Sequence, residues 1–239
     1  MESDIHGRRA LVLGASGGMG AAVASKLARC GVYSALAGRD LSKLEAACSV
    51  CSDAGGNAVP VELDIANMAK IEGAVQASIE QLGGLDFLIH CAGVQISRKA
   101  FDADLDAWDN MLDVNFRGFT HIVRHAVPHI NESPCGAIVC IGSITAAYSG
   151  AAMHHASKRA LSGYCESLFE DVREFGTKVC VINPGFVDTP MVRSDRLDRG
   201  KMIQPEDIAR TVIFVLRMPE SACPTEITLR PQRTPYIDR

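Results

Sequence analysis

Short apolar runs alternate with longer stretches of helical periodicity from one end of the chain to the other. Most of these runs are continuously apolar, a pattern that is typical of parallel strands covered by helices on both faces. The alternation predicts an α/β fold with a doubly wound, Rossmann-type parallel sheet of about seven strands. We expect the strands near residues 9–13, 33–37, 58–63, 85–90, 136–142, 178–182 and 225–229.

Two helix starts carry local signals. Ser42 is followed three residues later by Glu45, which is the spacing of a capping box. Pro205 is followed by Glu206 and Asp207, and a first helical turn favours proline and acidic residues. Helices are therefore expected to begin at these two points.

Composition narrows the class of protein. The chain has 239 residues, of which 47% are hydrophobic, and this size suits one domain over residues 1–239. The net charge is only −4 and the basic residues are spread out, so we expect no nucleic acid partner. No apolar stretch reaches the roughly 18 residues of a membrane helix, so we expect no membrane partner either. Cysteines inside apparent core segments fit a reducing, cytoplasmic location.

Two patterns resemble metal ligands without completing a site. Cys48 and Cys51 form a CxxC that lacks a second ligand pair. His121, His125 and His129 repeat at intervals of four, but no carboxylate or cysteine motif accompanies them. We therefore expect no metal, and place the histidines at an interface or on a solvated face.

A glycine-rich segment, residues 14–20, follows the first predicted strand and leads directly into a helical pattern. Its glycines let the backbone turn sharply and bring N–H groups close to a diphosphate, at which the following helix directs its N-terminus. The segment predicts a dinucleotide site that includes Gly14, Ser16, Gly18, Met19 and Gly20.

The end of the second strand indicates which nucleotide binds. The strand ends at Gly38, and Arg39 and Asp40 follow. NAD sites usually have an acid at this strand end, whereas the Arg39 guanidinium can grip a 2′-phosphate, so NADP is favoured over NAD. Arg39 could also be an ordinary surface arginine, and Asp40 could contact a ribose or cap the next helix.

Two further strand ends are expected to line the nucleotide. Asp64 and Ile65 follow the third strand, where the carboxylate could accept from the adenine amino group or cap a helix. The fourth strand leads into Cys91, Ala92 and Gly93, which are small enough for the backbone to pass close to a ribose.

Spaced motifs over nearly all of its length make the chain resemble the short-chain dehydrogenase/reductase family. The glycine loop matches, and the family's Asn-Asn-Ala-Gly strand end reads His90-Cys91-Ala92-Gly93. The family's helix asparagine and active-site serine match Asn115 and Ser143. The resemblance implies a nicotinamide cofactor and a homodimer or homotetramer. It also implies that four residues lie along the nicotinamide and its carboxamide: Pro184, Gly185, Val187 and Thr189.

One position departs from the family pattern. The family has Tyr-x-x-x-Lys, in which the lysine lowers the tyrosine pKa so that the phenol exchanges a proton with the substrate oxygen. Lys158 is present, but His154 stands at the tyrosine position, 11 residues after Ser143 and about two fewer than the family usually shows. Tyr148 could supply the proton instead, whereas His155 would point about 100° away around the helix.

The resemblance implies roles for the four residues of this group. Ser143 would donate to a carbonyl oxygen, Asn115 would hold a water, and Lys158 would bind the nicotinamide ribose. His154 would be a weak proton donor, because the nearby lysine charge should keep it mostly neutral at pH 7. We therefore expect slow turnover that accelerates as the pH falls towards about 6.

The stretch 190–203 is charged, and in the family this region closes over the substrate. Arg193, Arg196 and Arg199 would suit a small polar or anionic substrate, or they are plain surface arginines. The segment from Thr225 to Pro231 resembles the family branch that acts on small hydroxy acids and aldehydes.

The sequence thus predicts an NADP(H)-dependent oxidoreductase that reduces a small aldehyde or ketone, or oxidises the matching alcohol or hydroxy acid. Its activity would be reduced by the missing tyrosine. The alternative is a nucleotide-binding sensor or scaffold without useful turnover. Its best support is that histidine replaces the motif tyrosine at position 154.

Overall fold

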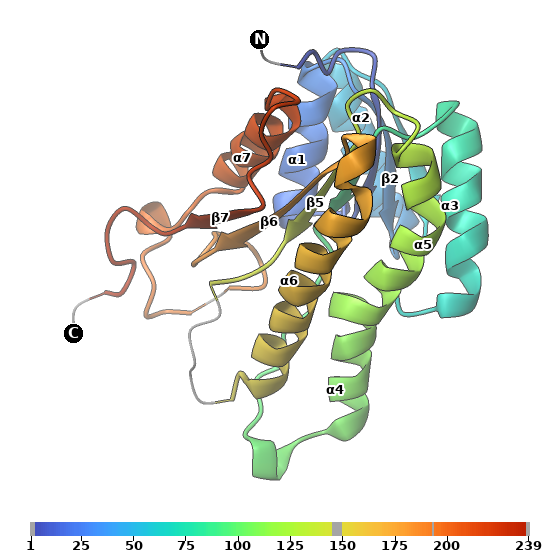
Figure 1. Ribbon diagram of the computed structural model, residues 1–239. Helices are drawn as coiled ribbons and strands as arrows, with labels where there is room; N and C mark the ends of the chain where they lie inside the picture. Colours follow the sequence, from blue (N-terminus) through green and yellow to red (C-terminus); the bar gives the residue numbers. More distant parts are fainter. Residues whose placement is uncertain (1–2, 145–149, 193, 238–239) are drawn as a thin grey trace.

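The computed structural model describes residues 3–144, 150–192 and 194–237. Seven parallel strands form one sheet in the order β3-β2-β1-β4-β5-β6-β7 (Figure 1). The strand order reverses between β1 and β4, and such a reversal opens a crevice beyond the carboxyl ends of the strands. The strands are β1 Arg9–Leu13, β2 Tyr33–Gly38, β3 Ala58–Glu62, β4 Phe87–His90, β5 Ala137–Ile141, β6 Lys178–Pro184 and β7 Glu226–Leu229.

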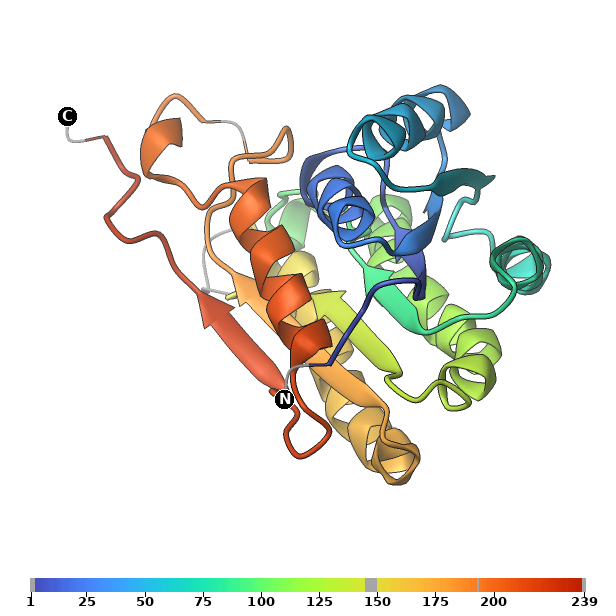
Figure 2. The same ribbon diagram turned by 90° about the horizontal axis from the view of Figure 1, so that it is seen from above.

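Helices cover both faces of the sheet (Figure 2). Successive side chains of β1 point to opposite faces: Val12 packs in one core layer and Leu11 and Leu13 in the other. One layer holds α1 Gly18–Arg29, α2 Leu41–Asp53 and α7 Pro205–Arg217, and the other holds α3 Met68–Leu82, α5 Gly118–Ile130 and α6 Ala152–Val172. The helix α4 Leu105–Leu112 continues into α5 through a π-helical turn, Asp113–Arg117.

The doubly wound parallel sheet that the sequence predicts is confirmed, and each predicted strand agrees with an observed one to within two residues. The buried, continuously apolar strands made this possible, because β4 and β5 are buried along their whole lengths. Within the described residues, no helix is both long enough and apolar enough to span a bilayer.

The two predicted helix starts have different outcomes. The helix α7 begins at Pro205, and Asp207 accepts a hydrogen bond from the Gln204 N–H, as the sequence indicates. The capping box predicted at Ser42 is wrong, because α2 begins at Leu41 with Asp40 as its cap. The Asp40 carboxylate accepts from the Lys43 N–H, and the Ser42 hydroxyl donates to that same carboxylate rather than capping the helix itself.

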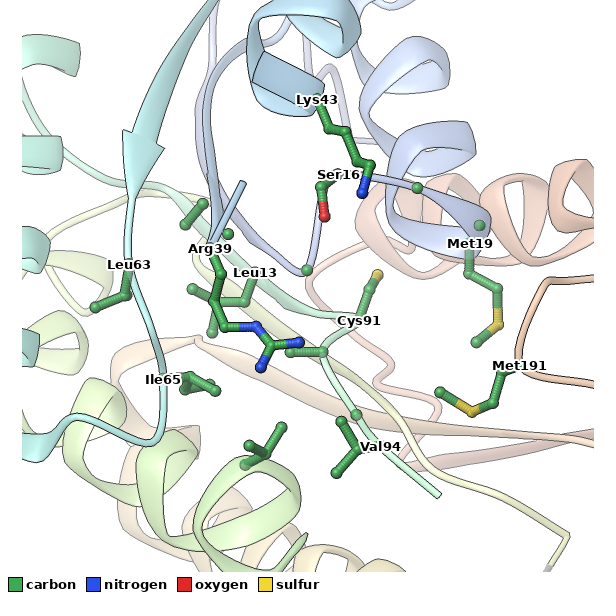
Figure 3. A pocket seen from close by; sticks show the side chains of 18 of the residues that line it. Leu13, Ser16, Met19, Arg39, Lys43, Leu63, Ile65, Cys91, Val94 and Met191 are labelled. Atoms are coloured by element: carbon green, nitrogen blue, oxygen red, sulfur yellow. The ribbon is translucent and has the colours of Figure 1, made fainter. Parts of the chain in front are cut away.

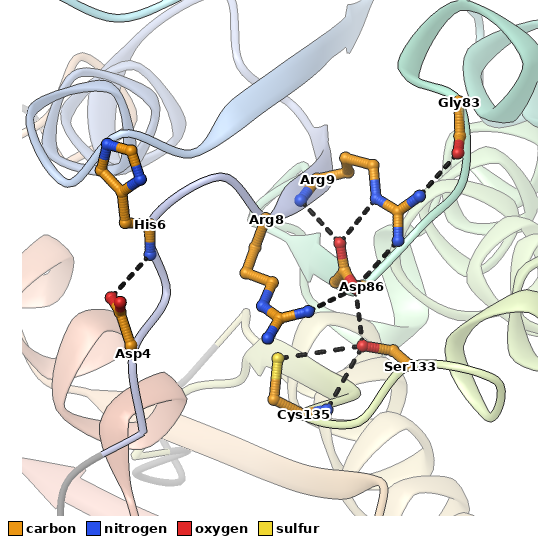
Figure 4. A network of polar contacts seen from close by, with 8 residues as sticks. All are labelled: Asp4, His6, Arg8, Arg9, Gly83, Asp86, Ser133 and Cys135. Atoms are coloured by element: carbon orange, nitrogen blue, oxygen red, sulfur yellow. Dashed lines mark hydrogen bonds and ion pairs between the residues drawn. The ribbon is translucent and has the colours of Figure 1, made fainter.

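A buried carboxylate joins the starts of three strands at the end of the sheet opposite the crevice. Asp86, just before β4, is fully buried and accepts hydrogen bonds from the Arg9 N–H at 2.8 Å and the Arg9 guanidinium at 2.8 and 3.1 Å. The Ser133 hydroxyl, in the turn before β5, donates to it at 2.6 Å, and Arg8 lies 3.9 Å away (Figure 4). Burial alone would raise the pKa of the Asp86 carboxyl, but the hydrogen bonds from Arg9 and Ser133 outweigh it, so the pKa lies below its usual value.

We predict that Asp86→Asn lowers the free energy of unfolding by about 2 to 4 kcal/mol at pH 7, because the half-buried Arg9 guanidinium loses its buried charge partner. The native carboxylate contributes its stability above the unfolded pKa of about 4 and loses it as the pH falls through the lower folded pKa, so the difference should shrink in acid. Urea denaturation at pH 7 and at low pH measures both effects, with the exposed Glu72→Gln as control. A variant as stable as the native chain at pH 7 would contradict the role of this carboxylate.

Candidate functional site

A cleft of about 530 Å³ lies beyond the carboxyl ends of the strands, where the strand order reverses (Figure 3). This volume is in the range of small-molecule and cofactor sites, roughly 300 to 1,000 Å³. Its walls come from the turns after β1, β2, β3 and β4 and from residues 189–191 after β6. Eleven residues that the sequence places at a cofactor line it: Gly14, Ser16, Gly18, Met19, Arg39, Asp64, Ile65, Cys91, Ala92, Gly93 and Thr189.

The glycine loop brings backbone so close to backbone that side chains would not fit. Gly14 has a φ of 76°, and a Cβ there would lie 2.7 Å from the Cα of Ala92. Gly20 lies behind the loop, and its Cβ would overlap the Gly14 carbonyl oxygen. The helix α1 begins at Gly18 without an acidic residue in its first turn, so its N-terminus is positive and open towards the cleft. The loop is therefore built to receive an anion on main-chain N–H groups.

Two cationic side chains point into the cleft, one from the end of β2 and one from the start of α2 (Figure 3). Arg39 is exposed, and so is Lys43 in the first turn of α2. Lys43 was missed by the sequence reasoning, although its place four residues after Arg39 at the start of a predicted helix was a usable signal. Asp40 pairs with the Lys43 ammonium at 2.8 Å, and the bonds from Lys43 and Ser42 hold the Asp40 pKa well below its usual range. The sequence allowed Asp40 two possible roles, a ribose contact and a helix cap, and the structure shows the helix cap.

The turn after β3 forms an apolar corner of the cleft. Leu63 and Ile65 line it from one side, and Val114 lines it from the π-helical turn. Asp64 is exposed and accepts from the Ala66 N–H at 3.1 Å, so it closes a local turn and is not the cap of α3. Its contact with an adenine stays a prediction.

Asn115 is fully buried at the centre of the π-helical turn. Its side chain accepts from the Val94 N–H at 2.8 Å and donates to the Val94 carbonyl at 3.0 Å and the Ser157 hydroxyl at 3.0 Å. A single π turn interrupts a helix, and such turns are frequent at functional sites. Asn115 thus fixes the segment after β4 against α6, a link that helical periodicity did not predict.

Lys158 lies next to Asn115 and Gly93. It is 7% exposed, and its Nζ donates to the Ile141 carbonyl at 2.8 Å. A Cβ on Gly93 would lie 3.3 Å from Lys158 Nζ and 3.4 Å from Asn115 Oδ1, so the three residues meet at one point. Burial lowers the pKa of Lys158 to about 8, and the nearby Cys140 acts in the opposite direction.

His154 lies in the first turn of α6, four residues before Lys158, and is half-buried. Burial, the Lys158 charge and His155 lower its pKa to about 4. The sequence predicted the direction of this shift from Lys158 alone, and burial proves to be the larger cause. Any increase in rate from an imidazolium would therefore need a pH well below 6. Tyr148, the alternative proton donor, lies outside the described residues.

The end of β6 positions the segment that the resemblance places along a nicotinamide. Pro184 ends the strand and accepts from the Ile144 N–H at 3.1 Å, next to Ser143, whose own N–H donates to Asn183 Oδ1 at 3.0 Å. Val187 pairs with Ile203, and residues 189–191 just beyond it line the cleft. Thr189 reaches the cleft wall, whereas Gly20, Asn115, Ser143, His154, Lys158, Pro184, Gly185 and Val187 lie outside that wall.

The C-terminal tail runs along the loop that the sequence assigns to the substrate. Leu197 forms an antiparallel bridge with Tyr236, and the Asp198 N–H donates to the Pro235 carbonyl at 2.7 Å. The Tyr236 ring meets Phe186 edge-on at 5.6 Å. Arg199 binds Asp188 at 2.7 Å, Arg196 is exposed, and Arg193 lies outside the described residues.

The cysteine pair and the histidine repeat that resemble metal ligands lie on two different helices, α2 and α5. Across residues 3–144, 150–192 and 194–237, no group of three His, Cys, Asp or Glu side chains could hold a metal ion. Cys48 and Cys51 lie in α2, and the histidine stripe lies on α5 with His121 exposed.

Comparison with known proteins gives matches over nearly the whole chain. A family model described as short chain dehydrogenase matches residues 8–200. An uncharacterized oxidoreductase from Staphylococcus haemolyticus is 32% identical over 96% of this chain and 99% of its own length. A short chain dehydrogenase from Burkholderia cenocepacia, solved in complex with NADP, has a TM-score of 0.88 and 30% identity over 96% of this chain and 98% of that chain. A metagenomic short-chain oxidoreductase in complex with NADP has a TM-score of 0.85 and 27% identity over 97% and 100%.

We predict that Asn115→Leu, which keeps the size but removes the amide, lowers the free energy of unfolding by about 2 to 3 kcal/mol, because the Val94 N–H and carbonyl lose their partner. Denaturation measures the loss, and amide hydrogen exchange at Val94 should accelerate in the variant. The exposed Asn110→Leu on α4 is the matched control. Unchanged exchange protection at Val94 would overturn this assignment.

Proposed function

The chain belongs to the short-chain dehydrogenase family of oxidoreductases, and we propose that it is NADP(H)-dependent and reduces a small aldehyde or ketone, or oxidises the matching alcohol or hydroxy acid. The observation that carries the NADP assignment is the pair of cations, Arg39 and Lys43, at the end of β2 and the start of α2. The acid in this region, Asp40, is engaged by the cap of α2 and by Lys43, so it is not free to select NAD through ribose hydroxyls. The two relatives solved with NADP support the same cofactor.

The residues of the cleft suit a phosphorylated dinucleotide. The main-chain N–H groups of the glycine loop and the start of α1 would hold the diphosphate. Arg39 and Lys43 would hold the 2′-phosphate, and Leu63, Ile65 and Val114 would cover the adenine. The remaining predicted contacts, Pro184, Gly185, Val187 and Thr189, would lie along the nicotinamide. When bound, NADPH supplies the hydride that reduces the carbonyl carbon.

Delivery of a proton to the substrate oxygen is harder to explain than hydride transfer, because the neutral imidazole of His154 is a poor acid. With a pKa of about 4, only about one His154 ring in a thousand is protonated at pH 7. Lys158, with a pKa of about 8, is protonated in about nine molecules of ten. Lys158 is therefore the better proton source, and it lies one helical turn from His154.

We assign His154 the role of a relay. One ring nitrogen gives its proton to the substrate oxygen as hydride reaches the carbonyl carbon, while the other takes a proton from Lys158. The ring stays neutral before and after the step, and Lys158, left as an amine, regains its proton from water. Ser143 donates to the carbonyl oxygen and Asn115 holds the surrounding backbone.

A sensor or scaffold remains the second candidate, and the observation that favours it is the histidine at position 154. Such a protein would keep the same cofactor contacts and lose only the turnover. The two candidates share the cleft and differ in the proton step alone.

We predict that Arg39→Gln weakens NADPH binding roughly 10- to 100-fold and Lys43→Gln weakens it less, because each removes a charge-assisted bond to the 2′-phosphate. Binding of NADH, which lacks that phosphate, should change by less than about twofold. Isothermal titration with both nucleotides measures the difference, with the exposed Lys70→Gln on α3 as control. Equal losses for NADPH and NADH would refute the phosphate contact.

We predict that carbonyl reduction by the native chain is level between about pH 5.5 and 7 and falls above about pH 8, where Lys158 loses its proton. His154→Phe should lower kcat by roughly 10² or more and leave the NADPH Kd unchanged, because it removes only the relay. Steady-state assays across a carbonyl panel measure both, with the exposed His121→Phe as control.

The same assays separate the second candidate. His154→Tyr restores the family motif, so a large gain over an inactive native chain would indicate an intact site that has lost its proton donor. Inactivity of both chains, with NADPH still bound, would favour the scaffold. A rate that keeps rising below pH 6 would contradict the relay.

A further inference from the structure

Asn183, the next-to-last residue of β6, is a buried amide to which no function has been assigned so far. It is 6% exposed, and both ends of its amide are engaged. The Oδ1 atom accepts from the Ser143 N–H at 3.0 Å, and the Nδ2 group donates to Glu226 Oε1 at 2.8 Å. The amide therefore links the segment after β5 to the first residue of β7, with β6 between them (Figure 1).

Main-chain hydrogen bonds to β6 hold the residues on either side of Ser143. The Gly142 N–H donates to the Ile182 carbonyl at 2.8 Å, and the Ile144 N–H donates to the last residue of the strand at 3.1 Å. Between them, the Ser143 N–H donates to the side chain of Asn183 instead. The backbone position of Ser143 therefore depends on a side chain, whereas main chain holds both of its neighbours.

The close approach of this side chain depends on the glycine before Ser143. A Cβ on Gly142 would overlap Asn183 Oδ1. Any other residue at position 142 would therefore push the amide away from the Ser143 N–H. The pair Gly142-Ser143 and the amide of Asn183 are thus matched in shape as well as in hydrogen bonding.

Glu226 selects which end of the amide faces Ser143. A carboxylate only accepts hydrogen bonds, so it attracts the Nδ2 group of Asn183 and repels the amide oxygen. The reversed amide would also place two donors, Nδ2 and the Ser143 N–H, against each other. Glu226 is exposed on the edge strand of the sheet, so it can be substituted without disturbing the core.

We propose that Asn183 is a positioning residue for Ser143 and that Glu226 orients its amide for this task. The amide fixes the backbone of Ser143, and with it the point from which the hydroxyl donates to the carbonyl oxygen of the substrate. A misplacement of about 1 Å can lower a rate by roughly 10², so this support matters for the reaction. The role of Ser143 rests on the proposed function, but the hydrogen-bonded link from Glu226 to Ser143 can be tested without turnover.

Amide hydrogen exchange at Ser143 in the full-length protein tests this link, measured relative to the amides of β1, which report global opening. Asn183→Leu removes the acceptor and should accelerate exchange at Ser143 roughly tenfold or more. Glu226→Gln replaces an obligate acceptor by a group that can also donate, so it should accelerate exchange by about threefold or more. The exposed Glu220→Gln is the matched control. Equal exchange at Ser143 in the native chain and both variants would overturn the proposal.

A paired substitution separates positioning from a general loss of packing. Asn183→Asp places two carboxylates where a donor and an acceptor lie 2.8 Å apart, so their repulsion should break the link. Combined with Glu226→Gln, it restores the link with donor and acceptor exchanged, because the new amide donates to the new carboxylate, whose other oxygen accepts from the Ser143 N–H. The double variant should return exchange at Ser143 to within about twofold of the native value. Exchange as fast as in Asn183→Asp alone would contradict the proposal.

Steady-state kinetics provides the readout that a purely structural role would not move. Asn183→Asp should lower kcat for carbonyl reduction roughly 10- to 100-fold and leave the NADPH Kd within about twofold, and the double variant should recover most of the rate. Faster exchange at Ser143 with an unchanged kcat would overturn the proposal, because the contact would then serve packing alone. An inactive native chain would instead count against carbonyl reduction, and exchange at Ser143 would still decide whether Asn183 holds it.

Discussion

The crossing of two backbones at the end of β1 is the constraint on which the cleft depends. Gly14 turns off the strand in a left-handed conformation and passes against Ala92, which leaves room for main chain alone. Gly20 meets the same turn from the other side, so α1 starts close to the sheet with its N-terminus directed into the cleft. Any side chain at either position would push helix and strand apart and remove the anion site.

The residues proposed to recognise the cofactor are exposed at the rim of the cleft, whereas the lysine proposed to supply the proton is buried. Arg39 and Lys43 are exposed at the rim, where water screens their charges, and they suit a phosphate that arrives from solution. Lys158 is buried, so its charge is held by a few oriented groups and its pKa is lowered into a useful range. Under the proposed function, Arg39 and Lys43 would distinguish nucleotides without disturbing the proton chemistry of Lys158.

Much of the sheet could be predicted because most of its strands are buried and continuously apolar. Most of the cleft followed because ligands bind beyond strand ends. What escaped prediction depends on contacts between distant segments. The π-helical turn at Asn115 leaves no mark in the α-helical periodicity of the sequence, because it depends on the contact of Asn115 with Val94. The hydrogen-bond partners of Asp86, Arg9 and Ser133, lie 77 and 47 residues away along the chain. The position of Asp86 inside a predicted strand therefore did not indicate which residues it would contact. The capping box at Ser42 was wrong because Asp40, two residues earlier and also able to cap the helix, takes that role.

The protonation of Lys158 also bears on the direction of the reaction. In the proposed relay, reduction would consume the proton that the ammonium carries, whereas oxidation of an alcohol would need the amine to accept one. A lysine with its ordinary pKa near 10.4 would almost never be an amine at neutral pH, but a pKa of about 8 leaves about a tenth of the molecules in that form. His154, with a pKa of about 4, changes charge in neither direction near neutral pH. In the proposed relay, the pH dependence of both directions would therefore fall on a single buried amine.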